Sequence, residues 1–174
     1  MNVASWPMNI SWCAVLIPLS SLFGCDGTSE GTLFDVSAAL TTSTCGSGAV
    51  DAKDSWDFQV RLKEDGTTLT WDDVTTGTTT QGTISDGKFS VSDSNTYEIT
   101  AASAASEGCS VRRHDSCSGT TTTDKNDKLT KLEGDIVFKY SQATGYNWDS
   151  LIGASDGFDD LPCEVDYTFV ATPH

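Results

Sequence analysis

A serine framed by glycines has the setting of a catalytic nucleophile. Residues 153–157 read GASDG and match Gly-x-Ser-x-Gly, the strained turn that presents a nucleophilic serine between a buried strand and a helix. The general base would have to be His174, the one histidine downstream of Ser155. The flanking residues predict neither the strand nor the helix. A secreted serine hydrolase using Ser155 is therefore the second alternative, and we expect no enzyme.

Cys109, His114 and Cys117 carry the ligand types that zinc prefers. Their spacing matches no standard zinc finger, and an oxidising compartment would pair the two thiols. We therefore predict no metal site and a Cys109–Cys117 disulfide across a short loop. Arg112 and Arg113 make this segment the one basic spot of an acidic chain, where an anionic group could bind, although a solvated loop is the simpler interpretation.

The longest connection between predicted strands runs from residue 141 to 162 and combines aromatic with acidic side chains. A connection of this length is usually functional or disordered. Its carboxylates do not have the spacing of an EF-hand, and no cofactor is predicted. The segment is a candidate ligand loop, and packing of its aromatic residues over the end of the fold is the alternative. The candidate residues are Tyr146, Trp148, Asp149, Asp156, Phe158, Asp159 and Asp160.

Strands must position these residues, because apolar and polar side chains alternate along most of the chain. An alternating pattern is typical of strands with one buried face. The clearest examples are residues 34–40, 56–63, 97–101, 136–140 and 163–171. After residue 25 the chain has 24 Thr against 8 Leu, a bias that disfavours helix.

Two Asp-Gly pairs predict hairpin turns, at Asp65-Gly66 and at Asp86-Gly87. If each pair forms a two-residue loop, Leu62 faces Leu69 across the first hairpin and Ile84 faces Phe89 across the second. The first register fails further along the chain, so we expect a bulge or a strand end near Asp73. Residues 124–127 predict a third turn.

These patterns predict an all-β fold, an antiparallel up-and-down meander of about 8–10 strands in a closed or nearly closed barrel. One domain should span residues 32–174. In such a barrel the first and last strands are antiparallel neighbours, which brings Cys45 beside Cys163. Of the three connectivities that four cysteines allow, we predict Cys45–Cys163 with Cys109–Cys117. The layout resembles that of lipocalin-like and avidin-like barrels.

The N-terminus predicts export and lipidation. Residues 10–23 are almost entirely apolar and too few for a membrane span, as in a signal peptide. Residues 22–25 read LFGC and resemble a bacterial lipobox, although no Lys or Arg precedes Cys25. The resemblance, shared loosely with Thr-rich exported bacterial lipoproteins, implies a signal peptide at 1–24 and acylation of Cys25. Residues 25–31 then form the acylated cysteine and a polar tether, which anchors the chain outside the cytoplasm.

The charge excludes one class of partner. A net charge of -15 argues against nucleic acid, whose binding depends on Lys and Arg. The sequence predicts a monomeric, non-catalytic protein that is anchored to the bilayer through Cys25 and has a binding or structural role with an unknown small-molecule or protein ligand. The first alternative is a lipocalin-like carrier of a small apolar ligand. A void of about 300 Å³ or more would favour the carrier, and a packed interior would disfavour it.

Overall fold

The computed structural model describes residues 31–100, 108–143, 152 and 157–174. Eight strands and no helix occur among these residues, which confirms the predicted all-β class. The strands are β1 (Thr32–Ser43), β2 (Ser55–Asp65), β3 (Thr68–Asp73), β4 (Thr78–Ser85), β5 (Lys88–Thr100), β6 (Cys109–Thr123), β7 (Leu129–Gln142) and β8 (Cys163–Pro173).

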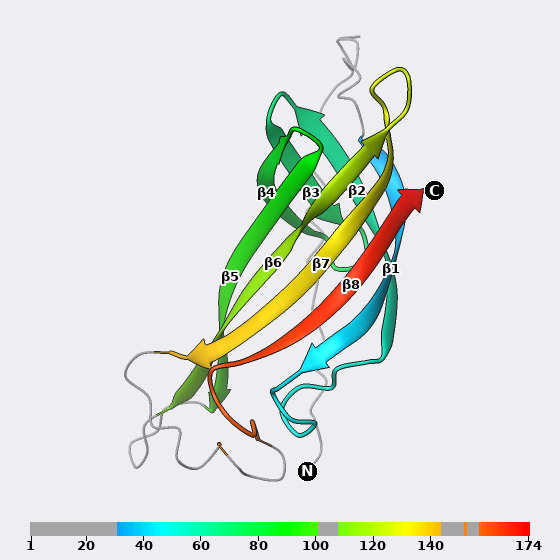
Figure 1. Cartoon of the computed structure of the whole chain (residues 1–174). Helices are drawn as coiled ribbons and strands as arrows, with labels where there is room; N and C mark the ends of the chain where they lie inside the picture. The colour runs from blue at the N-terminus through cyan, green and yellow to red at the C-terminus, as the bar shows by residue number, and fades with distance from the viewer. Residues whose placement is uncertain (1–30, 101–107, 144–151, 153–156) are drawn as a thin grey trace, which may run out of the picture.

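Each strand pairs antiparallel with the next one along the chain, and β8 pairs with β1 to close the barrel (Figure 1). The closing register sets Ala38 opposite Phe169 and Val36 opposite Ala171. The predicted closed meander is therefore confirmed. The long strands β5, β6, β7 and β8 run side by side, while β3 is the shortest strand.

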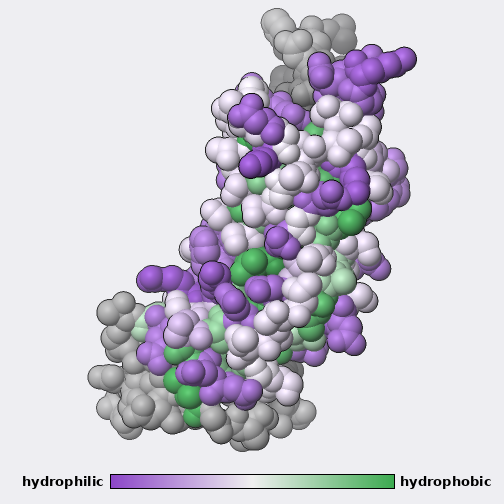
Figure 2. Space-filling view, in the orientation of Figure 1, coloured by the Kyte–Doolittle hydropathy of each residue, from purple (hydrophilic) through white to green (hydrophobic). Residues whose placement is uncertain are grey.

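The alternating pattern determines which side chains enter the barrel. Successive side chains of a strand point to opposite faces, so every second residue is buried. The fully buried side chains include Phe34, Val60, Leu69, Leu132 and Val165. Figure 2 shows the outer surface of the barrel. Polar and weakly polar residues cover most of the visible face, and apolar residues form scattered patches.

The cysteines pair only in part as predicted. Cys45 and Cys163 form a disulfide, and their Cα atoms lie 4.9 Å apart. This bond indicates a non-reducing, extracytoplasmic environment. The predicted Cys109–Cys117 bond is wrong, because Cys117 is a free, buried cysteine. Both residues belong to the single extended strand β6, where eight positions span roughly 26 Å, far beyond the ~7 Å limit for bridged Cα atoms.

The hairpin turns follow the Asp-Gly signals with one shift of register. Asp86 and Gly87 both have positive φ, and Ile84 faces Phe89 as predicted. In the first hairpin Asp65 pairs with Thr68, so the loop is Gly66-Thr67 and Leu62 faces Trp71 instead of Leu69. The shift keeps the same side chains inside, because it moves the pairing by two positions.

Candidate ligand cavity

The barrel wall opens between β4 and β5. These strands pair from Ser85↔Lys88 only as far as Gly82↔Val91, although β5 continues to Thr100 and remains paired to β6 throughout. The first residues of β4 pair with β3 alone. We call this unpaired stretch, between residues 78–81 of β4 and 92–96 of β5, the wall gap.

The wall gap leaves backbone groups of β5 without a strand partner. Residues of an antiparallel pair alternate between exchanging both backbone hydrogen bonds and exchanging none. The Thr121 N–H donates to the Gly87 carbonyl over 2.9 Å, so Gly87 and every second residue after it exchange their backbone hydrogen bonds with β6. Ser92, Ser94 and Thr96 therefore direct their N–H and C=O groups toward the wall gap, where no described strand pairs with them.

A partly open cavity of about 360 Å³ extends into the barrel behind the wall gap. This volume exceeds the value of about 300 Å³ above which a carrier is favoured. Side chains and backbone of six strands and of the β3–β4 turn line it: Trp56, Phe58, Trp71, Asp73, Thr76, Thr78, Thr80, Val91, Ser92, Asp93, Asn95, Tyr97, Arg113, Asp115, Ser116, Cys117, Ile136 and Phe138.

Aromatic rings form much of the cavity wall. Trp56 stacks on Phe58 with ring centroids 4.2 Å apart, and it lies 6.3 Å from the Phe138 ring. Trp71 packs against Phe89 and Phe169 deeper in the core. Such contacts hold rings in fixed orientations, so the wall is preformed.

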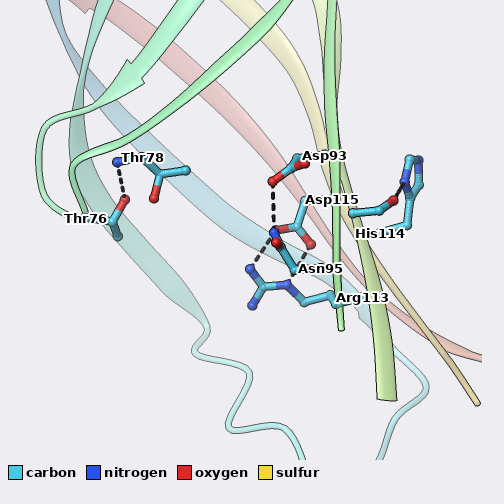
Figure 3. A network of polar contacts seen from close by, with 8 residues as sticks. Thr76, Thr78, Asp93, Asn95, Arg113, His114 and Asp115 are labelled. Carbon is cyan, nitrogen blue, oxygen red and sulfur yellow. Dashed lines mark hydrogen bonds and ion pairs between the residues drawn. The ribbon is translucent and has the colours of Figure 1, made fainter. Parts of the chain in front are cut away.

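Polar side chains gather at one side of the cavity, on neighbouring positions of β5 and β6 (Figure 3). Arg113 donates two hydrogen bonds of 2.6 Å to the Asp115 carboxylate, in a bidentate pair. The guanidinium also lies 5.2 Å from the ring centroids of both Tyr97 and Phe138. Burial opposes the Arg113 charge, but Asp115 outweighs that cost and raises the pKa of Arg113 above its ordinary value. Arg113 is therefore a permanent cation whose Nε and Nη2 groups are bound to Asp115.

Asp93 and Asn95 face this pair from β5. The register sets Asp93 directly opposite Asp115 and Asn95 directly opposite Arg113. The Asn95 amide donates to one Asp93 oxygen over 2.8 Å. Two carboxylates thus stand at directly opposite positions, and the Arg113 guanidinium bound to Asp115 offsets their repulsion.

Across the wall gap, the β3–β4 turn supplies the other rim. Asp73 ends β3, as the failing register predicted, and its carboxylate accepts hydrogen bonds from the N–H groups of Thr75 and Thr76. The Thr76 hydroxyl accepts from the Thr78 N–H, which orders the start of β4 (Figure 3). This rim offers threonine hydroxyls and a carboxylate.

The predicted basic loop is wrong, because residues 109–117 lie within β6 and alternate across it. Arg113 and Cys117 line the cavity, whereas Arg112 and His114 are exposed. The His114 Nδ1 lies 2.8 Å from the Ser94 hydroxyl. Burial raises the pKa of the Cys117 thiol above its ordinary value, so the thiol stays protonated.

The described part of the candidate ligand loop lies away from the cavity lining. Phe158 is buried and contacts Tyr140, with ring centroids 5.8 Å apart, as the packing alternative predicted. The Asp159 N–H donates to the Cys45 carbonyl, beside the disulfide. Asp159 and Asp160 are exposed.

Several predicted residues fall outside the described part of the chain. These are the signal peptide, Cys25 and most of the tether, Ser155, and the loop residues Tyr146, Trp148, Asp149 and Asp156. His174, the proposed base, is hydrogen-bonded on the outer face, where its Nδ1 lies 2.8 Å from Asp35 Oδ2.

The sequence analysis missed Asp93, Asn95 and Asp115 as cavity residues, and it placed Arg113 in a basic loop instead of on a strand. A signal was present, because Val111, Arg113, Asp115 and Cys117 occupy alternate positions of one strand. Charged residues at inward positions break the apolar pattern by which strands were recognised.

Comparison with protein-family models, curated proteins and solved structures finds no match to this chain. No helix among the described residues is long and apolar enough to cross a membrane.

Proposed function

We propose that this chain is a non-catalytic, lipid-anchored barrel of the cell envelope that binds one small amphipathic molecule in the cavity behind the wall gap. The observation that carries the binding role is the void of about 360 Å³ with an aromatic wall and a polar rim. Ligand cavities typically combine a predominantly apolar lining with a few convergent polar groups.

The wall gap supports access to this cavity. Complete pairing of every strand edge would hide the interior of the barrel. In this closed barrel β4 and β5 pair over only part of their length, and Ser92, Ser94 and Thr96 turn unpaired backbone groups toward the opening. A ligand entering between β4 and β5 would meet hydrogen-bonding groups at the rim and aromatic rings beneath. The geometry thus favours the carrier alternative over a purely structural role.

The anchoring role rests on the lipobox-like residues 22–25 and the polar residues that follow. More than one acyl chain on Cys25 would give stable attachment, which a single chain does not. The Cys45–Cys163 disulfide supports the same compartment.

Binding is tested by methyl NMR of the acylated protein in nanodiscs of zwitterionic lipid, titrated with 4-phenylbutan-1-ol. Methyl resonances of Val91 and Ile136, which line the cavity, should shift in a saturable manner. Those of Val60 and Leu132, which are buried outside the lining, should move far less. Equal shifts at both sets, or none, would reject a cavity site.

Anchoring is tested by metabolic labelling with an alkyne-bearing fatty acid in a bacterial host. Cys25 should carry the label and the protein should fractionate with membranes. Cys25→Ser should lose the label and leave the membrane fraction, whereas Cys117→Ser should keep both. A membrane-free, unlabelled Cys25 protein would overturn the anchor.

A further inference from the structure

We propose that the cavity selects an organic cation, in which an ammonium group is attached to an apolar body. The inference rests on the proposed function and specifies its ligand class. The ammonium would lie between Asp93 of β5 and Asp73 at the end of β3, on the two sides of the wall gap, and the apolar body would lie on the rings of Trp56, Phe58 and Trp71.

The lining has more acidic than basic side chains. Three carboxylates, Asp73, Asp93 and Asp115, face the cavity against the single cation Arg113. Arg113 is bidentate with Asp115, which neutralises both. Asp73 and the exposed Asp93 have no cationic partner among the described residues, so the mouth of the cavity carries an excess of negative charge.

Asp93 has an oxygen that is free to bind a cation. The residue stands directly opposite Asp115 in the β5–β6 ladder, and Arg113 already offsets the charge of Asp115. Asn95 donates to one Asp93 oxygen, and the other oxygen has no hydrogen-bond partner among the described residues. A bound ammonium would donate to that oxygen.

The aromatic wall of the cavity also favours a cationic ligand. Ammonium groups are attracted to the faces of aromatic rings, and most strongly to Trp. The molecule already shows this preference, because the Arg113 guanidinium lies 5.2 Å from two ring centroids. A hydrated metal ion would gain little from such a wall, which favours an organic cation.

An anionic ligand would need Arg113, and the structure does not leave it free. Its Nε and Nη2 groups both donate to Asp115, and the Tyr97 and Phe138 ring centroids lie 5.2 Å from the guanidinium carbon. A carboxylate ligand that used the same two donors would have to displace Asp115. The chemistry therefore disfavours anions.

The test compares three probes that share a phenyl-alkyl chain and differ in the charge of the terminal group. They are 4-phenylbutylammonium, 4-phenylbutan-1-ol and 4-phenylbutyrate, each titrated into the nanodisc-bound protein at low salt. Empty nanodiscs give the blank. The ammonium should bind about threefold to fivefold more tightly than the alcohol, and the carboxylate most weakly, because an ion pair at an exposed carboxylate contributes modestly. Added salt should reduce the ammonium preference.

Asp93→Asn should reduce the ammonium-to-alcohol ratio to about twofold or less and leave the alcohol affinity unchanged. The fold should tolerate this change, because residue 93 is exposed and an asparagine oxygen can still accept the hydrogen bond from Asn95. Asp65→Asn is the matched control: it changes the net charge equally, but Asp65 is exposed at the β2–β3 turn, outside the lining. Its ratio should equal that of the parent protein.

The outcomes separate the two proposals. If no probe shifts the Val91 and Ile136 methyls, the binding function itself fails. If the alcohol binds as tightly as the ammonium, or the carboxylate binds most tightly, a cavity ligand remains and the cation class is overturned. If Asp65→Asn lowers the ratio as much as Asp93→Asn, the preference reflects overall charge and the assignment to Asp93 is wrong.

Discussion

Cys163 at the start of β8 is bonded to Cys45, 118 positions earlier in the chain and just beyond the end of β1. The two strands pair antiparallel, so the end of one lies beside the start of the other. The bond therefore covalently joins the first and last strands where the barrel closes.

Removing this bond should cost much of the stability. For a closed loop of this length the chain-entropy model gives about 4–5 kcal/mol, against roughly 5–15 kcal/mol for a whole domain. Cys45→Ala/Cys163→Ala should lower the free energy of unfolding by that amount in urea denaturation. Reduction of the parent protein should reproduce the loss. A loss below about 1 kcal/mol would contradict a role in closure.

Cys117 should remain a protected thiol. Its side chain is buried, and burial raises its pKa, so both access and thiolate formation are suppressed. A maleimide pulse on the folded protein should leave the Cys117 peptide unlabelled, and denaturation without reductant should allow labelling. Ser118→Cys, at an exposed position of the same strand, should react at once. A requirement for reductant before Cys117 reacts would restore the rejected Cys109–Cys117 bond.

Hydrogen exchange should alternate along β5. The amides of Asp93 and Asn95 bond to β6, while those of Ser92, Ser94 and Thr96 face the wall gap. Amide exchange followed by NMR should therefore be slow at the first two and fast at the other three. Uniform protection from Ser92 to Thr96 would mean that another segment pairs with this edge.

The outer face supplies a pH-dependent contact. The Asp35 carboxylate accepts a 2.7 Å hydrogen bond from Gln59 and lies 2.8 Å from His174 Nδ1. The Gln59 bond and then the His174 contact lower the pKa of Asp35 below its ordinary value of 3.8. Because the folded-state pKa is lowered, the stabilisation is present above about pH 3.8 and is lost as the pH falls through the folded-state value.

Asp35→Asn should therefore reduce stability at neutral pH, and its difference from the parent protein should shrink in acid. Urea denaturation at several pH values measures this, with Asp65→Asn as the control. Carboxyl NMR titration gives the pKa directly. A value at or above 3.8 for Asp35 would contradict the assignment.

The fold was predictable because one periodicity dominates the sequence. Trp56 to Lys63 alternates without error, and the Asp86-Gly87 turn fixes its own register. The Cys45–Cys163 bond followed from the topology, since a meander places its ends together. The register of the first hairpin was harder to predict. The loops Asp65-Gly66 and Gly66-Thr67 both fit the Asp-Gly pair, and both bury the same side chains.

The cavity was not predictable from that pattern. Arg113 and Asp115 occupy inward positions of β6. Because they lie between Cys109 and Cys117, they were interpreted as part of a loop closed by a disulfide. Only the pairing of β5 with β6 shows that Asp93 stands opposite Asp115. The wall gap depends on where β4 and β5 separate, which no local sequence signal specifies.

The most direct test of ligand binding is to fill the cavity with a larger side chain from its own lining. Thr80 lines the cavity from β4, and its neighbour Gln81 is exposed on the outer face. Thr80→Phe should abolish saturable 4-phenylbutan-1-ol binding and change the free energy of unfolding by less than about 1 kcal/mol, because the added ring extends into the cavity and not into a packed core. Gln81→Phe should leave binding intact. Undiminished binding in Thr80→Phe, with the fold intact, would contradict the claim that this cavity is the ligand site.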